Sequence, residues 1–215
     1  WTQFETPSLF SYQKKLHIEM LHILKNAVLF ICISLVITPC FAQGGETYDG
    51  RVNFLTDPET GQTFNPFDVY GDELHYYIRP DARTMTINFE GADHVVDIAR
   101  LMHDAFETWR QVLNLRLIFE EANSPQGANL VISLSPVVSF PPALAASVPA
   151  YPSEAPHPAT LQFYTQTIQN TLRTPGTLQT IRDEMEAGLN NDDILHTMLM
   201  QTALHEIGHV LGYAH

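Results

Sequence analysis

The stretch ALHEIGHVLGYAH, residues 203–215, decides the fold and raises the functional question. His205 and His209 are four residues apart. Because a helix advances by about 100° per residue, their imidazoles lie on one helical face, one turn apart, and can share one metal ion. Gly212 can adopt a left-handed backbone conformation that turns the chain sharply after the helix. His215 can then return as a third ligand.

The residue types in this stretch indicate zinc chemistry. Three neutral imidazoles with an open fourth position are typical of a catalytic zinc site, whereas structural zinc sites are closed. Glu206 follows the first histidine and can point toward the same ion without ligating it. We predict that His205, His209 and His215 bind zinc, and that Glu206 is the general base that takes a proton from the attacking water. The alternative is a chance pattern of histidines exposed on a helix.

The composition favours one globular domain and argues against two classes of partner. The 215 residues suffice for one well-cored domain, and 45% of them are hydrophobic. With 11 Lys+Arg against 24 Asp+Glu, the chain lacks the clustered cations that bind nucleic acid or anionic membranes. Both cysteines, Cys32 and Cys40, lie near the N-terminus, so the remainder contains no disulfide or cysteine metal site. We expect a monomer.

The N-terminal part has the layout of a secretory signal. After Met20, a weakly basic start precedes the apolar segment AVLFICISLVI (27–37), which is shorter than the roughly 20 residues that span a bilayer. We therefore predict a signal peptide over 20–42, no stable membrane span, and a secreted, extracellular protein. Residues 1–19 are then translated upstream sequence. A buried hydrophobic helix and a lipoprotein signal ending at Cys40 are the alternatives.

The rest of the chain is predicted to be a lead-in and one catalytic domain. Residues 43–71 are rich in Gly, Pro, Asn and Asp and predict an irregular lead-in, followed by the domain over 72–215. Seven prolines within 136–160 limit any strand there to a short or edge position. Segments with strand composition, separated by turn signals, occupy 73–79, 84–91, 115–121, 129–135 and 160–166.

Hydrophobic periodicity predicts two long helices. Apolar residues recur in steps of three and four over 95–113, and Asp93 is the expected cap of that helix. The second helix covers about 192–211, where two aspartates suit its positive N-terminal end. Between them, 167–191 is ambiguous, with helical character in its second half.

The stretch HEIGHVLGYAH resembles the zinc signature of the metzincin clan of metalloendopeptidases, and it is most similar to the matrixin family. Upstream, a strand, a long helix ending AFETW, and the strands LRLIFEE and ANLVISLS follow the order of a matrixin N-terminal subdomain over 84–215. The resemblance implies an α+β (α/β-like) zincin fold with a twisted, mostly parallel five-stranded sheet and two long helices. It also implies the zinc and base roles given above.

The family's C-terminal subdomain and methionine turn would follow His215 and are missing from this sequence. We therefore expect a chain truncated after the third zinc ligand, with His215 held only by its own backbone.

The resemblance also assigns an edge strand that borders the cleft. ALAASVP (143–149) corresponds to the strand that pairs with an extended substrate, which implies that Leu144, Ala145 and Ala146 bind substrate. Matrixins often carry a second, structural zinc. Because Ala146 and Gln162 stand where histidines would be expected, we predict one catalytic zinc only. A calcium (Ca2+) requirement is compatible with the resemblance, although no calcium-loop pattern stands out.

We therefore expect a secreted zinc (Zn2+) metalloendopeptidase acting on protein or peptide substrates. A non-catalytic zinc-binding or scaffold domain derived from a metzincin is one alternative. A serralysin-like protease is the other. The intact Glu206 favours catalysis. Four further histidines show no metal-ligand spacing and are expected to be surface or satisfied core residues: His75, His94, His103 and His157.

Overall fold

The computed structural model describes residues 54–113, 116–151, 157–186 and 188–214. All of these belong to one unit, Gly50–His215. The predicted upstream sequence, the signal peptide over 20–42 and the predicted ligand His215 lie outside the described residues.

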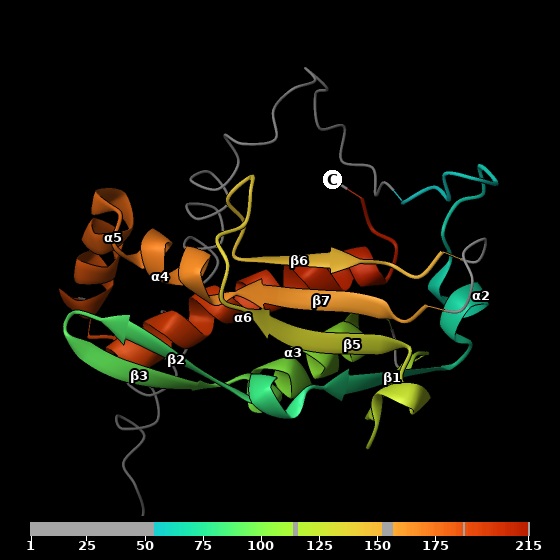
Figure 1. Cartoon of the computed structure of the whole chain (residues 1–215), viewed down its shortest axis with the longest axis horizontal. Coiled ribbons are helices and arrows are strands. Elements are labelled where there is room, and N and C mark those ends of the chain that lie inside the picture. The colour runs from blue at the N-terminus through green and yellow to red at the C-terminus, as the bar shows by residue number, and fades with distance from the viewer. Residues whose placement is uncertain (1–53, 114–115, 152–156, 187, 215) are drawn as a thin grey trace, which may run out of the picture. The chain divides into compact units, whose positions relative to one another are not determined.

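A five-stranded sheet organises the described chain (Figure 1). Its strand order is β4-β1-β5-β7-β6, and every pair is parallel except β6 with β7, which is antiparallel. The strands are β1 (Glu73–Ile78), β4 (Ile118–Glu121), β5 (Leu130–Ser135), β6 (Ala145–Val148) and β7 (Ala159–Tyr164). The expectation of a mixed α+β fold with a mostly parallel five-stranded sheet is confirmed. The short, proline-flanked β6 forms one edge, as the sequence predicted.

Two long helices, α3 (Ile98–Val112) and α6 (Asn191–Val210), lie side by side behind the sheet (Figure 1). Leu195, Leu199, Ala203, Ile207 and Val210 of α6 are buried, a stripe at three- and four-residue spacing that faces the core. Side chains of the central strands that face the core, such as Leu130, Ile132 and Leu161, are fully buried. This is typical of parallel strands in the interior of a sheet. Among the described residues, no helix is long and apolar enough to cross a membrane.

The start of the first long helix differs from the prediction. Residues 92–97 form strand β3 (Ala92–Asp97), which pairs with β2 (Thr84–Phe89) as a separate antiparallel hairpin. Asp97, not Asp93, caps α3, with its Oδ1 accepting a hydrogen bond from the Arg100 amide at 2.9 Å. The tight turn at Gly91, with φ of +80°, reverses the chain and makes this β-branched stretch a strand rather than a first helical turn.

The remaining predictions are refined by three short helices. The ambiguous stretch contains α4 (Thr165–Leu172) and α5 (Pro175–Glu186), so the last two residues of the predicted strand over 160–166 already belong to α4. Within the lead-in, α2 (Pro66–Tyr70) begins after the cap Asn65. The lead-in is therefore less irregular than predicted. Tyr70 is buried there, and its hydroxyl donates a hydrogen bond to the Val210 carbonyl at 3.0 Å, satisfying an orphan carbonyl at the end of α6.

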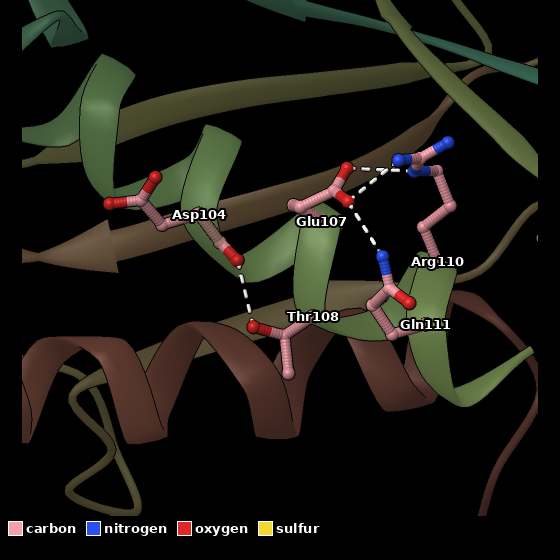
Figure 2. Close-up of polar contacts among 5 residues, drawn as sticks. All are labelled: Asp104, Glu107, Thr108, Arg110 and Gln111. Carbon is pink, nitrogen blue, oxygen red and sulfur yellow. Dashed lines mark hydrogen bonds and ion pairs between the residues drawn. The ribbon is translucent and has the colours of Figure 1, made fainter.

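The solvent face of α3 carries a local polar network (Figure 2). Arg110 donates two hydrogen bonds of 2.7 Å to the Glu107 carboxylate, and Gln111 adds a third at 3.0 Å. The Arg110 hydrogen bonds lower the pKa of Glu107 to about 2. Because the network is exposed to solvent, its role is to keep this face of the helix polar rather than to stabilise the fold strongly.

Candidate metal centre

The structure brings His205 and His209 together on one face of α6. Their Nε2 atoms lie 3.1 Å apart, and their rings are nearly perpendicular at an interplanar angle of 88°. Two zinc–nitrogen bonds of about 2.0–2.1 Å at a tetrahedral angle would place the two nitrogens about 3.3 Å apart. The observed separation therefore suits two imidazoles that share one zinc ion.

The surroundings of both rings suit metal binding. His209 Nδ1 lies 2.7 Å from the Tyr213 carbonyl oxygen. Since a carbonyl only accepts, Nδ1 carries a proton, and in the neutral ring this tautomer leaves the Nε2 lone pair for a metal. Two effects lower the pKa of His205 below its usual value: partial burial, which is the larger, and the charge of the nearby His209. Both favour the neutral ring.

A glycine turn at the end of α6 places this carbonyl beside Nδ1 of His209. Gly212 has φ of +90°, its amide donates to the His209 carbonyl, and the Tyr213 amide donates to the Gly208 carbonyl, both at 2.9 Å. These two bonds define a Schellman motif, in which the left-handed residue ends the helix and reverses the chain. The turn that was predicted to return a third ligand therefore also orients the second one.

The lead-in fixes the same turn from the other side. The Leu55 amide donates to the Gly212 carbonyl at 2.6 Å, and Phe54 pairs with Tyr213 through a backbone bridge and a ring contact of 5.2 Å. Gly212 and Tyr213 are therefore held by contacts with a distant part of the sequence. The prediction that His215 is held only by its own backbone lies outside the described residues.

Trp109 of α3 supports the helix that carries the histidines. Its indole Nε1 donates to the Leu204 carbonyl at 2.9 Å, and its ring stacks on Tyr213 with centroids 5.3 Å apart. A Cβ on Gly208 would lie 3.2 Å from the indole, so glycine allows this close approach. These contacts place Trp109 in the packing between α3 and the end of α6.

Replacing Trp109 by phenylalanine should lower the free energy of unfolding by about 1–2 kcal/mol, because a hydrogen bond and part of the packing are lost. Urea denaturation measures this change. Val112→Ala, at an exposed position on the same helix, is the control and should change stability by less than about 0.5 kcal/mol. Equal effects of both variants would contradict the supporting role of Trp109.

Glu206 faces the sheet and not the solvent. Its side chain is 8% exposed, and its Oε2 accepts a hydrogen bond of 2.8 Å from the Ser147 hydroxyl in β6. This contact joins α6 to the predicted substrate strand. The sequence pattern does not predict Ser147 or the Tyr213 carbonyl as groups of this site. Ser147 follows directly after the predicted substrate residues, so its position in that strand was the available signal.

Only some residues of the edge strand β6 direct their backbone groups to its outer edge. The Tyr164 amide donates to the Leu144 carbonyl at 2.9 Å, so Leu144 bonds inward to β7. In an antiparallel ladder the hydrogen-bonded pairs alternate, which directs the backbone groups of Ala145 and Ser147 to the outer edge. Ala146 lies directly opposite Gln162 in the register. Among the described strands, β7 is the sole partner of β6.

A second group of side chains could hold a metal ion. Glu73, His75 and Glu120 offer ligand atoms within 4.8 Å of one another, with His75 Nε2 3.3 Å from Glu73 and Nδ1 3.9 Å from Glu120. The sequence predicts that His75 is a surface or satisfied core residue, and its place in this group differs from that prediction. Glu73 and His75 share one face of β1, and Glu120 is the register partner of His75 in β4. Exposed acidic groups often gather without a metal, and this mainly oxygen-donor set is not specific for zinc.

Comparison with known proteins gives one informative result. No protein-family model matches the sequence, and no curated protein matches it. A chain of the GM1-bound form of the ECX AB5 holotoxin is similar in structure, with a TM-score of 0.59 and 18% sequence identity. The match covers 75% of this chain and 59% of that chain, so the present chain spans less than two thirds of its neighbour. At this identity the likeness shows the fold alone.

Proposed function

We propose that this protein is a matrixin-like metzincin, a zinc-dependent metalloendopeptidase that hydrolyses peptide bonds in proteins. The observation that carries the proposal is the 3.1 Å separation of His205 Nε2 and His209 Nε2, with the tautomer of His209 set by a backbone carbonyl. Glu206 lies next to the first of these histidines in the same helix. The sequence pattern adds His215 as the third ligand.

Each residue has a separate task in the proposed reaction. His205, His209 and His215 would hold the ion, and bound zinc supplies a Lewis acid that acidifies water and polarises a carbonyl. Glu206 accepts the proton of the attacking water and returns it to the leaving amine when the peptide bond breaks. Its low exposure supports this role. A carboxylate shielded from bulk water exchanges protons with the bound reactants rather than with the solvent.

The edge strand β6 supports an extended peptide as the substrate. Outward backbone groups of Ala145 and Ser147 can add a substrate strand to the sheet by main-chain hydrogen bonds. Of the three residues first assigned to substrate binding, Ala145 is the best placed by this criterion. Leu144 and Ala146 direct their backbone groups to β7, so their contribution would come from side chains.

Two alternatives remain open to experiment. A non-catalytic zinc-binding or scaffold domain would bind zinc without cleaving peptides, and a serralysin-like protease would differ from a matrixin outside the described residues. Secretion, a monomeric state, one zinc ion and a calcium requirement stay predictions. Exposure of the protein to a peptide mixture, with new termini identified by mass spectrometry, tests the proposal. Cleavage that persists in a zinc chelator would contradict it.

Zinc should stabilise the protein through the histidines of α6. At a free zinc concentration 100 times the dissociation constant, we expect about 2.7 kcal/mol of added stability, seen as a higher Tm. His209→Ala should remove most of this gain. His103→Ala, which replaces an exposed histidine on α3, is the matched control.

His75→Ala separates the two candidate metal sites. If zinc acts at α6, this variant keeps the zinc-dependent rise in Tm. Loss of the rise in His75→Ala, with retention in His209→Ala, would place the ion at Glu73, His75 and Glu120 and contradict the proposed centre.

A further inference from the structure

The contact between Ser147 and Glu206 connects two elements that the sequence places far apart. Ser147 belongs to the edge strand β6, and Glu206 belongs to α6. The hydroxyl donates to Oε2 at 2.8 Å, and the carboxylate is almost fully shielded from solvent. A hydrogen bond from a hydroxyl to an ionised carboxylate is shorter and roughly twice as strong as one between neutral groups.

We propose that Ser147 is a positioning residue that fixes the orientation of the Glu206 carboxylate. This inference rests on the proposed function, in which Glu206 is the general base. With Oε2 held by the Ser147 hydroxyl, Oε1 is the oxygen left to accept the proton of the attacking water. A carboxylate without this contact can rotate about its terminal side-chain bond, which has broad, weakly defined minima.

The local sequence gives Ser147 a task that its neighbours cannot perform. Within β6, Ala145 and Ser147 occupy the same face because side chains alternate along a strand. Ala145 is buried and has no donor, whereas Ser147 places its hydroxyl against α6. Val148 is exposed on the opposite face. Among the described side chains of this strand, the serine is the one that can donate to Glu206.

The same residue would serve the substrate and the base at once. Its side chain holds Glu206, and its backbone groups point to the outer edge of β6, where the proposed substrate strand adds. Substrate pairing along the edge would therefore act on the strand that orients the base. Catalytic groups need to be held within about 0.5 Å of their productive position, so a fixed link between strand and base has a direct effect on rate.

The kinetic test compares Ser147→Ala with Ser147→Thr. The alanine variant should lose roughly 10–100-fold in kcat, the range typical for groups that orient a catalytic residue. KM and zinc affinity should change by less than about twofold, because no ligand or substrate contact is removed. Ser147→Thr keeps the hydroxyl and should restore most of the activity. Ser133→Ala, a serine in the neighbouring part of the sheet that bonds Gln162, is the matched control.

A double variant shows whether Ser147 acts through Glu206. In a Glu206→Gln background, Ser147→Ala should cause no further loss of kcat, since the base is already absent. If Ser147→Ala lowers kcat by the same factor in this background as in the parent, the serine acts elsewhere, and the proposal is overturned. A kcat of Ser147→Ala within twofold of the parent would overturn it as well.

A spectroscopic test on the zinc-free protein is independent of activity. Isotope-edited infrared spectroscopy with labelled glutamate follows the carboxylate stretch that disappears in Glu206→Gln. Ser147→Ala should shift this band, and Ser147→Thr should leave it in place. If the parent cleaves no peptide, the proposed function fails. The infrared band then tests only whether Ser147 donates a hydrogen bond to Glu206. A shift supports the hydrogen bond, and an unchanged band overturns it.

Discussion

Glu206→Gln should reduce peptide hydrolysis by roughly 10²–10⁴-fold, the usual contribution of a general base. Glutamine has nearly the same shape as glutamate, and its amide oxygen can still accept the hydrogen bond from Ser147. The fold and the two histidine ligands of α6 should therefore be unaffected. The change is measured as kcat on a peptide substrate, with zinc content determined on the same sample.

The control for this variant is Glu186→Gln at the exposed end of α5. It removes the same charge far from the histidines in sequence and should leave kcat unchanged. If Glu206→Gln turns over peptide at the parent rate while retaining zinc, Glu206 is not the base. Zinc binding without cleavage in the parent would favour the non-catalytic alternative.

Gly212→Ala should be the most destabilising single change at the C-terminal end of α6. An added Cβ would lie 2.1 Å from Cδ1 of Phe64, and the backbone has φ of +90°, which disfavours any residue with a side chain. Backbone strain of about 1–3 kcal/mol and overpacking of about 1–3 kcal/mol should act together. We expect a loss of roughly 2–6 kcal/mol, measured by urea denaturation of the zinc-free protein.

Gly61→Ala provides a matched comparison, because Gly61 has φ of +70° but no atom within 4 Å of the new Cβ. It therefore measures backbone strain without overpacking. The difference between the two variants isolates the contact with Phe64. Zinc affinity should fall only in Gly212→Ala, since displacement of the turn moves the Tyr213 carbonyl away from His209. Equal losses in both variants would contradict the tight packing on Phe64.

The sequence predicted those features that depend on local spacing. The helical periodicity of α6, the juxtaposition of His205 and His209, and the short edge strand all follow from residues close in sequence. The hairpin of β2 and β3 was missed because Val95 fits the apolar period of the following helix, although it is exposed in the structure. Only the tight turn at Gly91 indicates that residues 92–97 form a strand and not the first turn of the helix.

Contacts between distant segments could not be predicted in this way. Ser147 and Glu206 meet because β6 packs against α6, and nothing in either short stretch specifies that pairing. The group formed by Glu73, His75 and Glu120 depends on the parallel register of β1 and β4. Strand register is set by the whole sheet, so a metal-ligand spacing measured along the chain does not detect such a group.

The bond between Leu55 and Gly212 joins the two ends of the described chain, and this has a consequence for the order of folding. Bringing together segments so distant in sequence requires closing a very long loop, which slows the step that forms the contact. During synthesis the lead-in emerges early, and the Leu55 amide cannot bond the Gly212 carbonyl until the turn after α6 has been made. The backbone support of His209 would therefore be completed late, after the sheet has formed. A nascent chain would pass through a stage in which its sheet is assembled and its histidines are not yet held in place.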